Sequence, residues 1–396
     1  MTARVLPALI DPIAADVFRS EYWEQRPLHV ARPLPPWCGT LPAIGDLDAI
    51  ISLTSPPGDA ANELRLVKTS PHGTEELPVP RGADGRPDMS SVYRAYAAGW
   101  TVIVNTVHQR DTRVARLALG VGRDLGHRVG VNLYFTPAGS QGFKAHVDGH
   151  DVFILQLEGR KSWRVFPPGY PLPLQDQDVP IDGGRLDHPL LEVTTEPGHV
   201  LYIPRGFIHD GAAASEASMH MTIGVHVLRW IDVLEAAVRE AALHDVRLRR
   251  TAPALDDADR RHVNTVAREL SRLLRRVPVR KAAAGALRQL RDKQDRAYQR
   301  SPDPQFRAIE RARSLRGATE VVQRIGLRPR VVRGPQRAQI EFGNRRVSAP
   351  LSAAPALEFV ARTERFRVKD LPEPLTSRSK IVLARRLIQE GLLTIV

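Results

Sequence analysis

The stretch "AHVDGHDVFILQLEGRKSW", residues 145 to 163, places a histidine and an aspartate two positions apart in front of an apolar run. Because side chains alternate between the two faces of a strand, we expect His146 and Asp148 on one face and Val147 on the other. An imidazole nitrogen and a carboxylate oxygen would then converge on one point. A second histidine from a distant strand would complete a facial set of three metal ligands.

The segment "GHVLYIPRGFIHDGA", residues 198 to 212, supplies that histidine. An apolar run from Val200 to Ile203 is followed by a Pro-Arg-Gly turn and then by His209. Two histidines and one carboxylate leave three open positions on the metal, which is typical of non-haem Fe(II) oxygenases. Zinc hydrolases more often use three histidines or a helical HExxH motif, and this sequence contains no HExxH. A His-x-Asp pair alone is weak evidence for a metal site, so the interpretation depends on the sequence that surrounds it.

Those surroundings predict a small antiparallel barrel over residues 128 to 228. Short β-like runs are separated by Gly- and Pro-rich turns such as "PAGSQG", "EGRK" and "PRGF". A barrel of this kind binds ligands in its mouth, which inward-facing alternate residues line. The β-like runs are "VNLYFTP", "DVFILQL", "SWRVFP", "VLYIP" and "MHMTIGVHV".

With these segments the chain resembles the JmjC-type 2-oxoglutarate oxygenases, and in particular their ribosomal oxygenase branch. The resemblance covers most of the chain and includes an N-terminal segment, "FRSEYWEQRPLHV" (residues 18 to 30). It implies an α+β fold with a double-stranded β-helix of the cupin or jelly-roll type. It also implies Fe(II) as cofactor and 2-oxoglutarate as co-substrate. By position, the iron ligands would be His146, Asp148 and His209, and the 2-oxoglutarate contacts would be Lys161, Tyr134 and Asn132.

Lys161 is a reasonable partner for the far carboxylate of 2-oxoglutarate. A buried carboxylate needs a paired charge, and an ammonium on a long stem can reach into a barrel. The resemblance favours Lys161, but the neighbouring Arg160 competes for the role because strand alternation alone does not choose between them.

Three further histidines near the predicted site need a different interpretation. His150 has the same strand parity as His146, so it is either a stray ligand or a substrate contact. His220 and His226 lie on a predicted core strand, and we expect both to be structural histidines with satisfied hydrogen bonds.

Composition indicates a globular protein of a reducing compartment. The chain has 396 residues and a single cysteine, Cys38, which excludes a disulfide framework and is typical of the cytoplasm. The N-terminus lacks the basic and apolar regions of a signal peptide. No apolar stretch approaches the ~20 residues of a membrane span. We therefore expect a cytoplasmic protein without a membrane segment.

Charge is distributed unevenly along the chain. Residues 229 to 396 contain 37 Lys or Arg and 19 Asp or Glu, a net charge of +18, whereas residues 1 to 228 carry −5. A mildly acidic catalytic half would suit a basic peptide, such as a tail of a ribosomal protein. The basic half could contact nucleic acid, or it could be a set of solvated arginine-rich helices.

The hydrophobic pattern predicts three domains. Residues 1–228 would form an N-terminal cap and the catalytic barrel. From Trp230 the apolar period changes to about 3.6, and residues 229–305 are predicted to be helical, with Ile231, Leu234, Val238 and Leu243 near one face. In the resembling family this region makes a homodimer, although such a face would equally pack on its own barrel. Residues 306–396 would form a winged-helix-like domain, with Thr376 or Ser377 capping the last helix and Gly391 ending it.

The leading hypothesis is a protein hydroxylase that modifies an arginine or histidine of a ribosomal protein. A second hypothesis keeps the same metal centre but changes the substrate to another peptide, a tRNA or a small metabolite. A third is a non-catalytic metal-binding regulator with a DNA-binding winged helix. The set of His146, Asp148, His209 and Lys161 argues against the third, because a regulator has no need of a carboxylate anchor.

Overall fold

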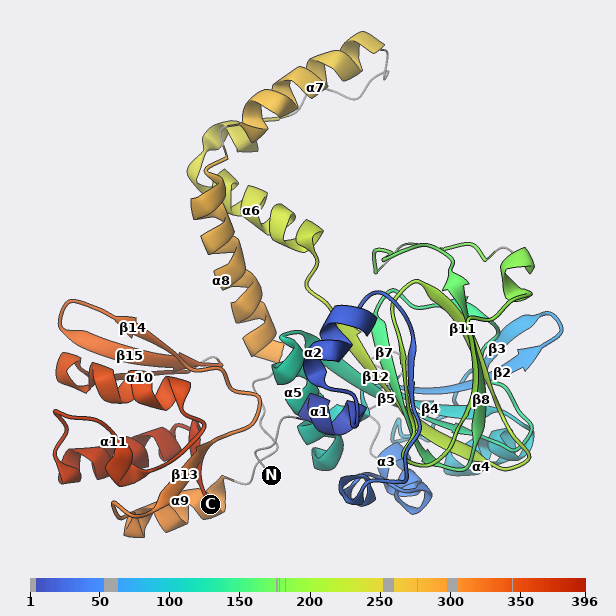
Figure 1. The fold of residues 1–396 in the computed structure, drawn as a ribbon, viewed down its shortest axis with the longest axis horizontal. Coiled ribbons are helices and arrows are strands. Elements are labelled where there is room, and N and C mark those ends of the chain that lie inside the picture. The colour runs from blue at the N-terminus through green and yellow to red at the C-terminus, as the bar shows by residue number, and fades with distance from the viewer. Residues whose placement is uncertain are drawn as a thin grey trace. The chain divides into compact units, whose positions relative to one another are not determined.

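The computed structural model describes residues 5–52, 63–175, 177, 179–181, 183–251, 260–275, 277–297, 305–343 and 345–396. The chain divides into two compact units (Figure 1). The first runs to Val227 and includes residues 305–310 and 324–326, and the second begins at Leu228. The predicted boundary near residue 305 adjoins residues 298–304, which lie outside the described residues, so the division into three domains stays a prediction.

Two antiparallel sheets form the barrel of the first unit. The larger has the strand order β1-β10-β7-β12-β5-β4-β2-β3, and the smaller has the order β6-β11-β8-β9. From β5 to β8 successive strands alternate between the two sheets, which makes the barrel a double-stranded β-helix within an α+β fold, as the sequence predicted. The strands are β1 (Leu28–Val30), β2 (Leu64–Ser70), β3 (Gly73–Leu77), β4 (Thr101–Val104), β5 (Arg128–Thr136), β6 (His146–Val147), β7 (Asp151–Glu158), β8 (Lys161–Pro168), β9 (Leu191–Thr195), β10 (Val200–Ile203), β11 (Phe207–Ala213) and β12 (Ser218–His226).

Strand β7 is buried on both faces, which explains the apolar run of residues 152–155 within it. Phe153 and Leu155 point into the main core beneath the helices, whereas Val152 and Ile154 point into the barrel. Beside β7 in the sheet, β12 pairs along its whole length with β5. The inner faces of β7, β12 and β5 therefore line one side of the barrel interior.

Strands β1 to β4 were not predicted as part of the barrel. The structure adds β1 to one edge of the larger sheet, where it pairs with β10, and adds β4, β2 and β3 to the other edge. These strands are short or lie far from the barrel in sequence, so their alternation alone does not indicate their partners. Their addition brings β2 to the rim of the barrel interior.

Helices cover the outer face of the larger sheet. The longest of them, α5, begins at the side chain of Asp111, which accepts hydrogen bonds from two backbone N–H groups, and is followed by Gly126 at φ +81°. Its Gly120 allows close approach of α1, because a Cβ there would lie 2.2 Å from Val5. The helices of this unit are α1 (Val5–Ile10), α2 (Ala15–Val17), the π-turn η1 (Phe18–Tyr22), α3 (Leu47–Ser52), α4 (Met89–Ala97), α5 (Thr112–Leu125) and most of α9 (Phe306–Arg311), with 3-10 turns η2 (Pro36–Thr40), η3 (Ile44–Asp46), η4 (Val107–Gln109) and η5 (Gly183–Leu186).

The second unit begins with three helices, as the change of period predicted: α6 (Trp230–His244), α7 (Arg260–Leu274) and α8 (Val279–Ala297). Helices α6 and α8 pack closely at Gly285 of α8, because a Cβ there would lie 2.5 Å from the side chain of Glu240 on α6. The predicted apolar face of α6 remains on the surface. Its residues Ile231, Leu234, Val238 and Leu243 are 38% to 61% exposed.

The described residues in the rest of the second unit form two small sheets and the helices α10 and α11. Thr376 caps α11 by accepting a hydrogen bond from the backbone N–H of Ser379, and Gly391 follows the helix at φ +80°. The order of elements is the predicted one, although the winged-helix assignment stays a prediction. The elements are η7 (Ala312–Ser314), β13 (Glu320–Gln323), β14 (Arg330–Arg333), β15 (Arg337–Phe342), β16 (Arg345–Pro350), η8 (Leu351–Ala353), α10 (Ala354–Arg362), β17 (Arg365–Arg367), η9 (Val368–Asp370), α11 (Ser377–Gln389) and β18 (Leu393–Ile395), preceded by the turn η6 (Val246–Arg249) after α6. In the described ranges, no helix has the length and hydropathy needed to cross a bilayer.

Candidate metal centre

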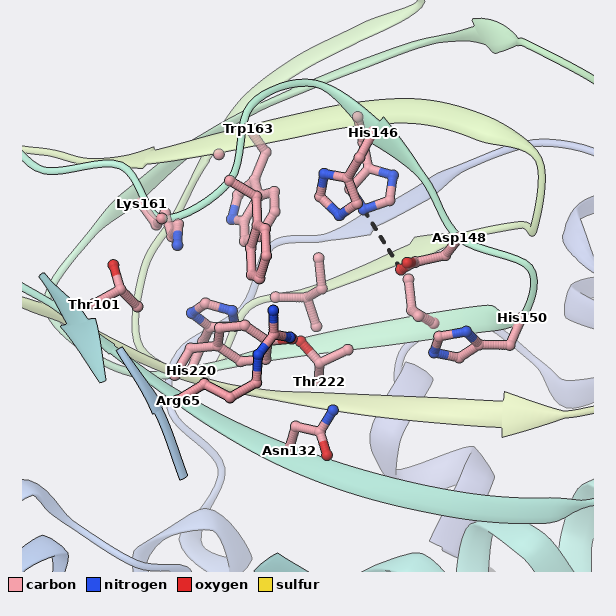
Figure 2. Close-up of a pocket in the computed structure, with 17 residues that line it drawn as sticks. Arg65, Thr101, Asn132, His146, Asp148, His150, Lys161, Trp163, His220 and Thr222 are labelled. Carbon is pink, nitrogen blue, oxygen red and sulfur yellow. Dashed lines mark ion pairs between the residues drawn. The ribbon is translucent and has the colours of Figure 1, made fainter. Parts of the chain in front are cut away.

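Strand pairing brings the three predicted ligands together. His146 on β6 is the register partner of His209 on β11, and the centroids of their rings lie 4.3 Å apart. Strand β6 ends at Val147, so Asp148 lies just beyond the strand rather than within it as predicted. Its Oδ2 is nevertheless 3.7 Å from Nε2 of His209 (Figure 2). Ligand atoms of all three residues lie within 4.8 Å of one another.

Backbone carbonyls determine which imidazole nitrogen is available. Nδ1 of His146 lies 2.9 Å from the carbonyl of Lys144, and Nδ1 of His209 lies 3.2 Å from that of Phe207. A carbonyl can only accept, so both Nδ1 atoms carry the proton and both Nε2 atoms have free lone pairs. Metal-binding histidines show this arrangement. Two neutral imidazole nitrogens and a carboxylate oxygen fit Fe(II).

The charges in the site also fit metal binding. Burial acts to raise the pKa of Asp148, but His150, His209 and His146 outweigh it and hold that pKa below its ordinary value. Burial and the neighbouring His146 lower the pKa of His209 to about 4. At neutral pH the carboxyl is therefore ionised and the imidazole is neutral, which are the forms that bind metal.

The three candidate ligands line a cavity of about 210 Å³ inside the barrel. Its wall includes Asn132 and Tyr134 from β5 and Lys161 from β8, the three residues that the family resemblance placed beside the co-substrate. This volume suits a small organic acid beside the metal better than a large cofactor.

Lys161 is a buried cation within this cavity. It is 4% exposed, and its Nζ donates to Oγ1 of Thr136 at 3.4 Å and lies 5.0 Å from the ring centroid of Trp163. Over the described residues, no carboxylate lies within ion-pair distance of it. Burial lowers the pKa of Lys161 to about 7. An ammonium held here without a counter-charge would bind an organic anion.

Arg160 points away from the cavity. Its Nε lies 2.9 Å from Oε1 of Glu216, and both side chains are about half exposed. Of the two residues that sequence reasoning left open, only Lys161 is therefore placed to meet a ligand in the cavity.

Asn132 and Tyr134 lie on the same face of β5. The side-chain oxygen of Asn132 accepts a hydrogen bond from the backbone N–H of Thr106 at 2.9 Å. Burial, followed by the charge of Asp148, raises the pKa of Tyr134 to about 12. Its hydroxyl is therefore protonated at neutral pH and can donate to a ligand.

His220 and His226 lack some of the hydrogen bonds that we expected for structural histidines. His220 is buried and lines the cavity, stacked on Tyr134 at 4.8 Å between ring centroids. Within the described part of the chain, Nδ1 of His220 and Nδ1 of His226 have no hydrogen-bond partner. His150 also lines the cavity and stacks on His226 at 5.1 Å. The sequence placed both histidines on one core strand, but their hydrogen bonds depend on neighbouring strands that the sequence does not pair.

Among the cavity residues that the sequence did not identify, Arg65 and Trp163 have the largest side chains with polar groups. Arg65 on β2 reaches the cavity (Figure 2). It forms a bidentate ion pair with Glu76, at 2.7 and 3.0 Å, and lies over the ring of Phe143. No local motif marks Arg65, because its place depends on β2 joining the sheet through β4. Trp163 lies two residues after Lys161 on β8, so alternation from Lys161 would have placed its ring in the cavity.

Comparisons with known proteins give a consistent result. Residues 106–233 match the family model of the JmjC domain. Ribosomal oxygenase 1 of Gallus gallus is 34% identical over 255 residues, which cover 62% of this chain and 41% of the relative. Ribosomal oxygenase 2 of Rattus norvegicus is 32% identical over 257 residues, which cover 62% and 53%. The chain thus spans about half the length of these relatives.

Among solved structures, the Escherichia coli ribosomal oxygenase YcfD in complex with cobalt and 2-oxoglutarate aligns with a TM-score of 0.51. The alignment covers 97% of this chain and 98% of that chain at 18% identity. At this identity the likeness shows a shared fold.

Proposed function

Because residues 106–233 are a JmjC domain and the chain is a homologue of the ribosomal oxygenases, we propose that it is an Fe(II)- and 2-oxoglutarate-dependent dioxygenase that hydroxylates a ribosomal protein. The observation that carries this proposal is the meeting of His146, Asp148 and His209 in one cavity with the buried amine of Lys161, which has no ion-pair partner among the described residues. When bound, Fe(II) and 2-oxoglutarate would supply the oxidising power that inserts one oxygen atom of dioxygen into a C–H bond, with release of succinate and carbon dioxide.

The chain itself would bind, orient and shield the reactants. His146, Asp148 and His209 would hold the metal from one side and leave its other side open to the cavity. Lys161 would pair with the far carboxylate of 2-oxoglutarate, and the hydroxyl of Tyr134 would donate to the same ligand. The apolar side chains of Val152 and Ile154 would keep water from the reacting atoms.

The charges of the cavity favour histidine over arginine as the target side chain. Of the residues that line the described cavity, only Asp148 is acidic, and it is assigned to the metal. Arg65 is already paired with Glu76, and Lys161 is assigned to 2-oxoglutarate. A guanidinium would therefore enter without a carboxylate partner, whereas a neutral imidazole could hydrogen-bond to Asn132.

Features outside the cavity support the proposed partners. The net charge of −5 on residues 1–228 would attract a basic ribosomal protein. The exposed apolar residues of α6 support a homodimer, because a second copy would bury them. The charge of +18 on residues 229–396 would favour contact with ribosomal RNA. The proposed place of action is the cytoplasm.

The proposal is tested in two steps. Purified protein with Fe(II), ascorbate and 2-oxoglutarate should release succinate, and a His146→Ala variant should not. Mass spectrometry of ribosomal proteins, from cells with and without the gene, should then reveal one protein that gains a single oxygen on a histidine. Succinate release without such a protein would point to another peptide, a tRNA or a metabolite as substrate. No succinate release would support the non-catalytic regulator.

A further inference from the structure

The chain crosses between the two barrel sheets twice beside the metal centre. Residues 148–150 lead from β6 to β7, and residues 204–206 lead from β10 to β11. The backbone N–H of Gly206 donates to the carbonyl of Asp148 at 3.0 Å and joins the two crossings. Gly206 has φ +92°, and a Cβ there would lie 2.3 Å from the carbonyl oxygen of Tyr170, so only glycine fits. One crossing begins at a candidate ligand, and the other ends three residues before His209.

A buried polar cluster lies at these crossings. Nη1 of Arg205 lies 2.7 Å from Oδ2 of Asp151 and 2.7 Å from Oε1 of Glu24. The hydroxyl of Tyr202 donates to Oδ1 of Asp151 at 2.8 Å and accepts from the backbone N–H of Glu24 at 3.0 Å. Arg205 is 6% exposed and Asp151 is 0% exposed. The cluster thus joins both crossings to the N-terminal segment.

Burying these charges is costly for folding. Burial raises the pKa of Asp151 above its ordinary value, although Arg205 acts in the opposite direction. Nε of Arg205 is also buried without a partner within the described ranges. Apolar side chains of similar volume would often stabilise such a position as well or better. A contribution to stability therefore does not explain why these charges are buried. The cluster lies between the two segments that carry the candidate ligands, which indicates a role in positioning them.

We propose that Arg205 is a positioning residue for the metal centre. Asp151 follows Asp148 by three residues, and Arg205 precedes His209 by four. By holding Asp151, Arg205 sets the distance between the carboxylate of Asp148 and the imidazole of His209. By holding Glu24, it makes the N-terminal segment part of the support of the centre. This inference rests on the proposed function only in taking the three residues as metal ligands.

The test uses Co(II) as a probe of the full-length chain. Binding is measured by calorimetry, and ligand geometry is measured from the visible absorption of the bound ion. In Arg205→Lys, which keeps the charge but loses the planar fork, we expect about tenfold weaker Co(II) binding and an altered absorption spectrum. A change in thermal stability alone would not alter that spectrum.

The matched control is Arg164→Met. Arg164 pairs with Asp210, which is next to His209, with Nε 3.0 Å from Oδ1, but its side chain is half exposed and lies outside the cluster. This variant should bind Co(II) within about twofold of the unmodified chain, because Asp210 alternates with His209 along β11 and its side chain lies on the other face of the sheet, beside Arg164. If Arg164→Met weakened Co(II) binding as much as Arg205→Lys, the proposal would be overturned.

A gentler variant keeps the proposal testable if Arg205→Lys does not fold. Tyr202→Phe retains the ring and removes only the hydroxyl that bonds to Asp151 and Glu24. We expect Co(II) binding to weaken on the order of threefold. Folded variants with the affinity and spectrum of the unmodified chain would overturn the proposal. Co(II) binding that His146→Ala does not change would instead overturn the metal centre itself, together with this proposal.

Discussion

His146 and His209 are direct partners across the antiparallel pair of β6 and β11. Their imidazoles meet because register, rather than proximity in sequence, places them opposite each other. Strand β6 has only two residues, so the candidate centre depends on a very short stretch of pairing. A shift of one residue would turn His146 to the other face of the sheet and separate the ligands.

Removal of a ligand should abolish metal-dependent turnover. His146→Ala or Asp148→Ala leaves two of the three ligands, so we expect loss of measurable succinate release and much weaker Co(II) binding. The fold should persist, because neither side chain belongs to the hydrophobic core. Circular dichroism and succinate assays check both points. The exposed His188 provides a control, His188→Ala, which should behave as the unmodified chain. Unchanged turnover in either ligand variant would contradict the assignment.

Loss of the buried cation should affect the co-substrate rather than the metal. Lys161→Ala removes the proposed partner of the far carboxylate. We expect the Kd of 2-oxoglutarate to rise at least tenfold, while Co(II) affinity stays within about twofold. Calorimetry with each ligand separates the two effects. Arg160→Ala is the matched control, because Arg160 pairs with Glu216 outside the cavity. Equal losses of both affinities would indicate a folding defect instead of a lost anchor.

Binding of 2-oxoglutarate should weaken as pH rises above 7. The lowered pKa of Lys161, about 7, means that the empty site holds an ammonium below this pH and a neutral amine above it. Only the ammonium attracts the carboxylate, so the Kd should rise by up to about tenfold per pH unit between pH 7 and 9. His209, with a pKa of about 4, and Tyr134, with a pKa of about 12, titrate outside this window.

The pH dependence has its own control. Lys161→Arg keeps a permanent charge at the position, so its Kd should be nearly flat over the same range. Calorimetric titrations at pH 6.5, 7.5 and 8.5 compare the two proteins. A flat profile in the unmodified chain would show that Lys161 remains charged throughout.

The last helix should depend on its cap. Thr376→Ala removes the hydroxyl that accepts from the backbone N–H of Ser379, and we expect the free energy of unfolding to fall by about 1 kcal/mol. Ser377→Ala, one residue further on, removes a hydroxyl from the first position of α11 and should cost much less. Urea denaturation followed by circular dichroism measures both. Equal costs would mean that the cap is not what stabilises the start of α11.

The sequence predicted the parts of the fold that depend on local pattern. The predicted span of the barrel, residues 128 to 228, agrees with β5 to β12, because alternation and glycine turns are local signals. The change to helical period at Trp230 agrees with the start of α6. The edge strands β1 to β4 were missed, because pairing between distant segments leaves little trace in one sequence.

In the candidate site, too, the sequence predicted the residues that belong to a local motif and missed those that depend on long-range pairing. His146, Asp148 and His209 carry a recognisable spacing, and Lys161 follows from its position in the resembling family. Arg65, His220 and Trp163 line the same cavity without any motif. The cluster of Arg205, Asp151 and Glu24 joins three segments that are far apart in the chain, so it can be recognised only in the folded structure.

Trp163 gives the cavity an optical reporter of its own. Its indole lies 5.0 Å from the amine of Lys161, and its Nε1 donates to Thr195. Indole emission responds to nearby charge, so a diacid that neutralises Lys161 would shift the fluorescence of this residue. Of the five tryptophans in the chain, Trp163 is the one that lines the described cavity. Binding of a diacid in the cavity could thus be followed by the intrinsic fluorescence of Trp163, without an added dye.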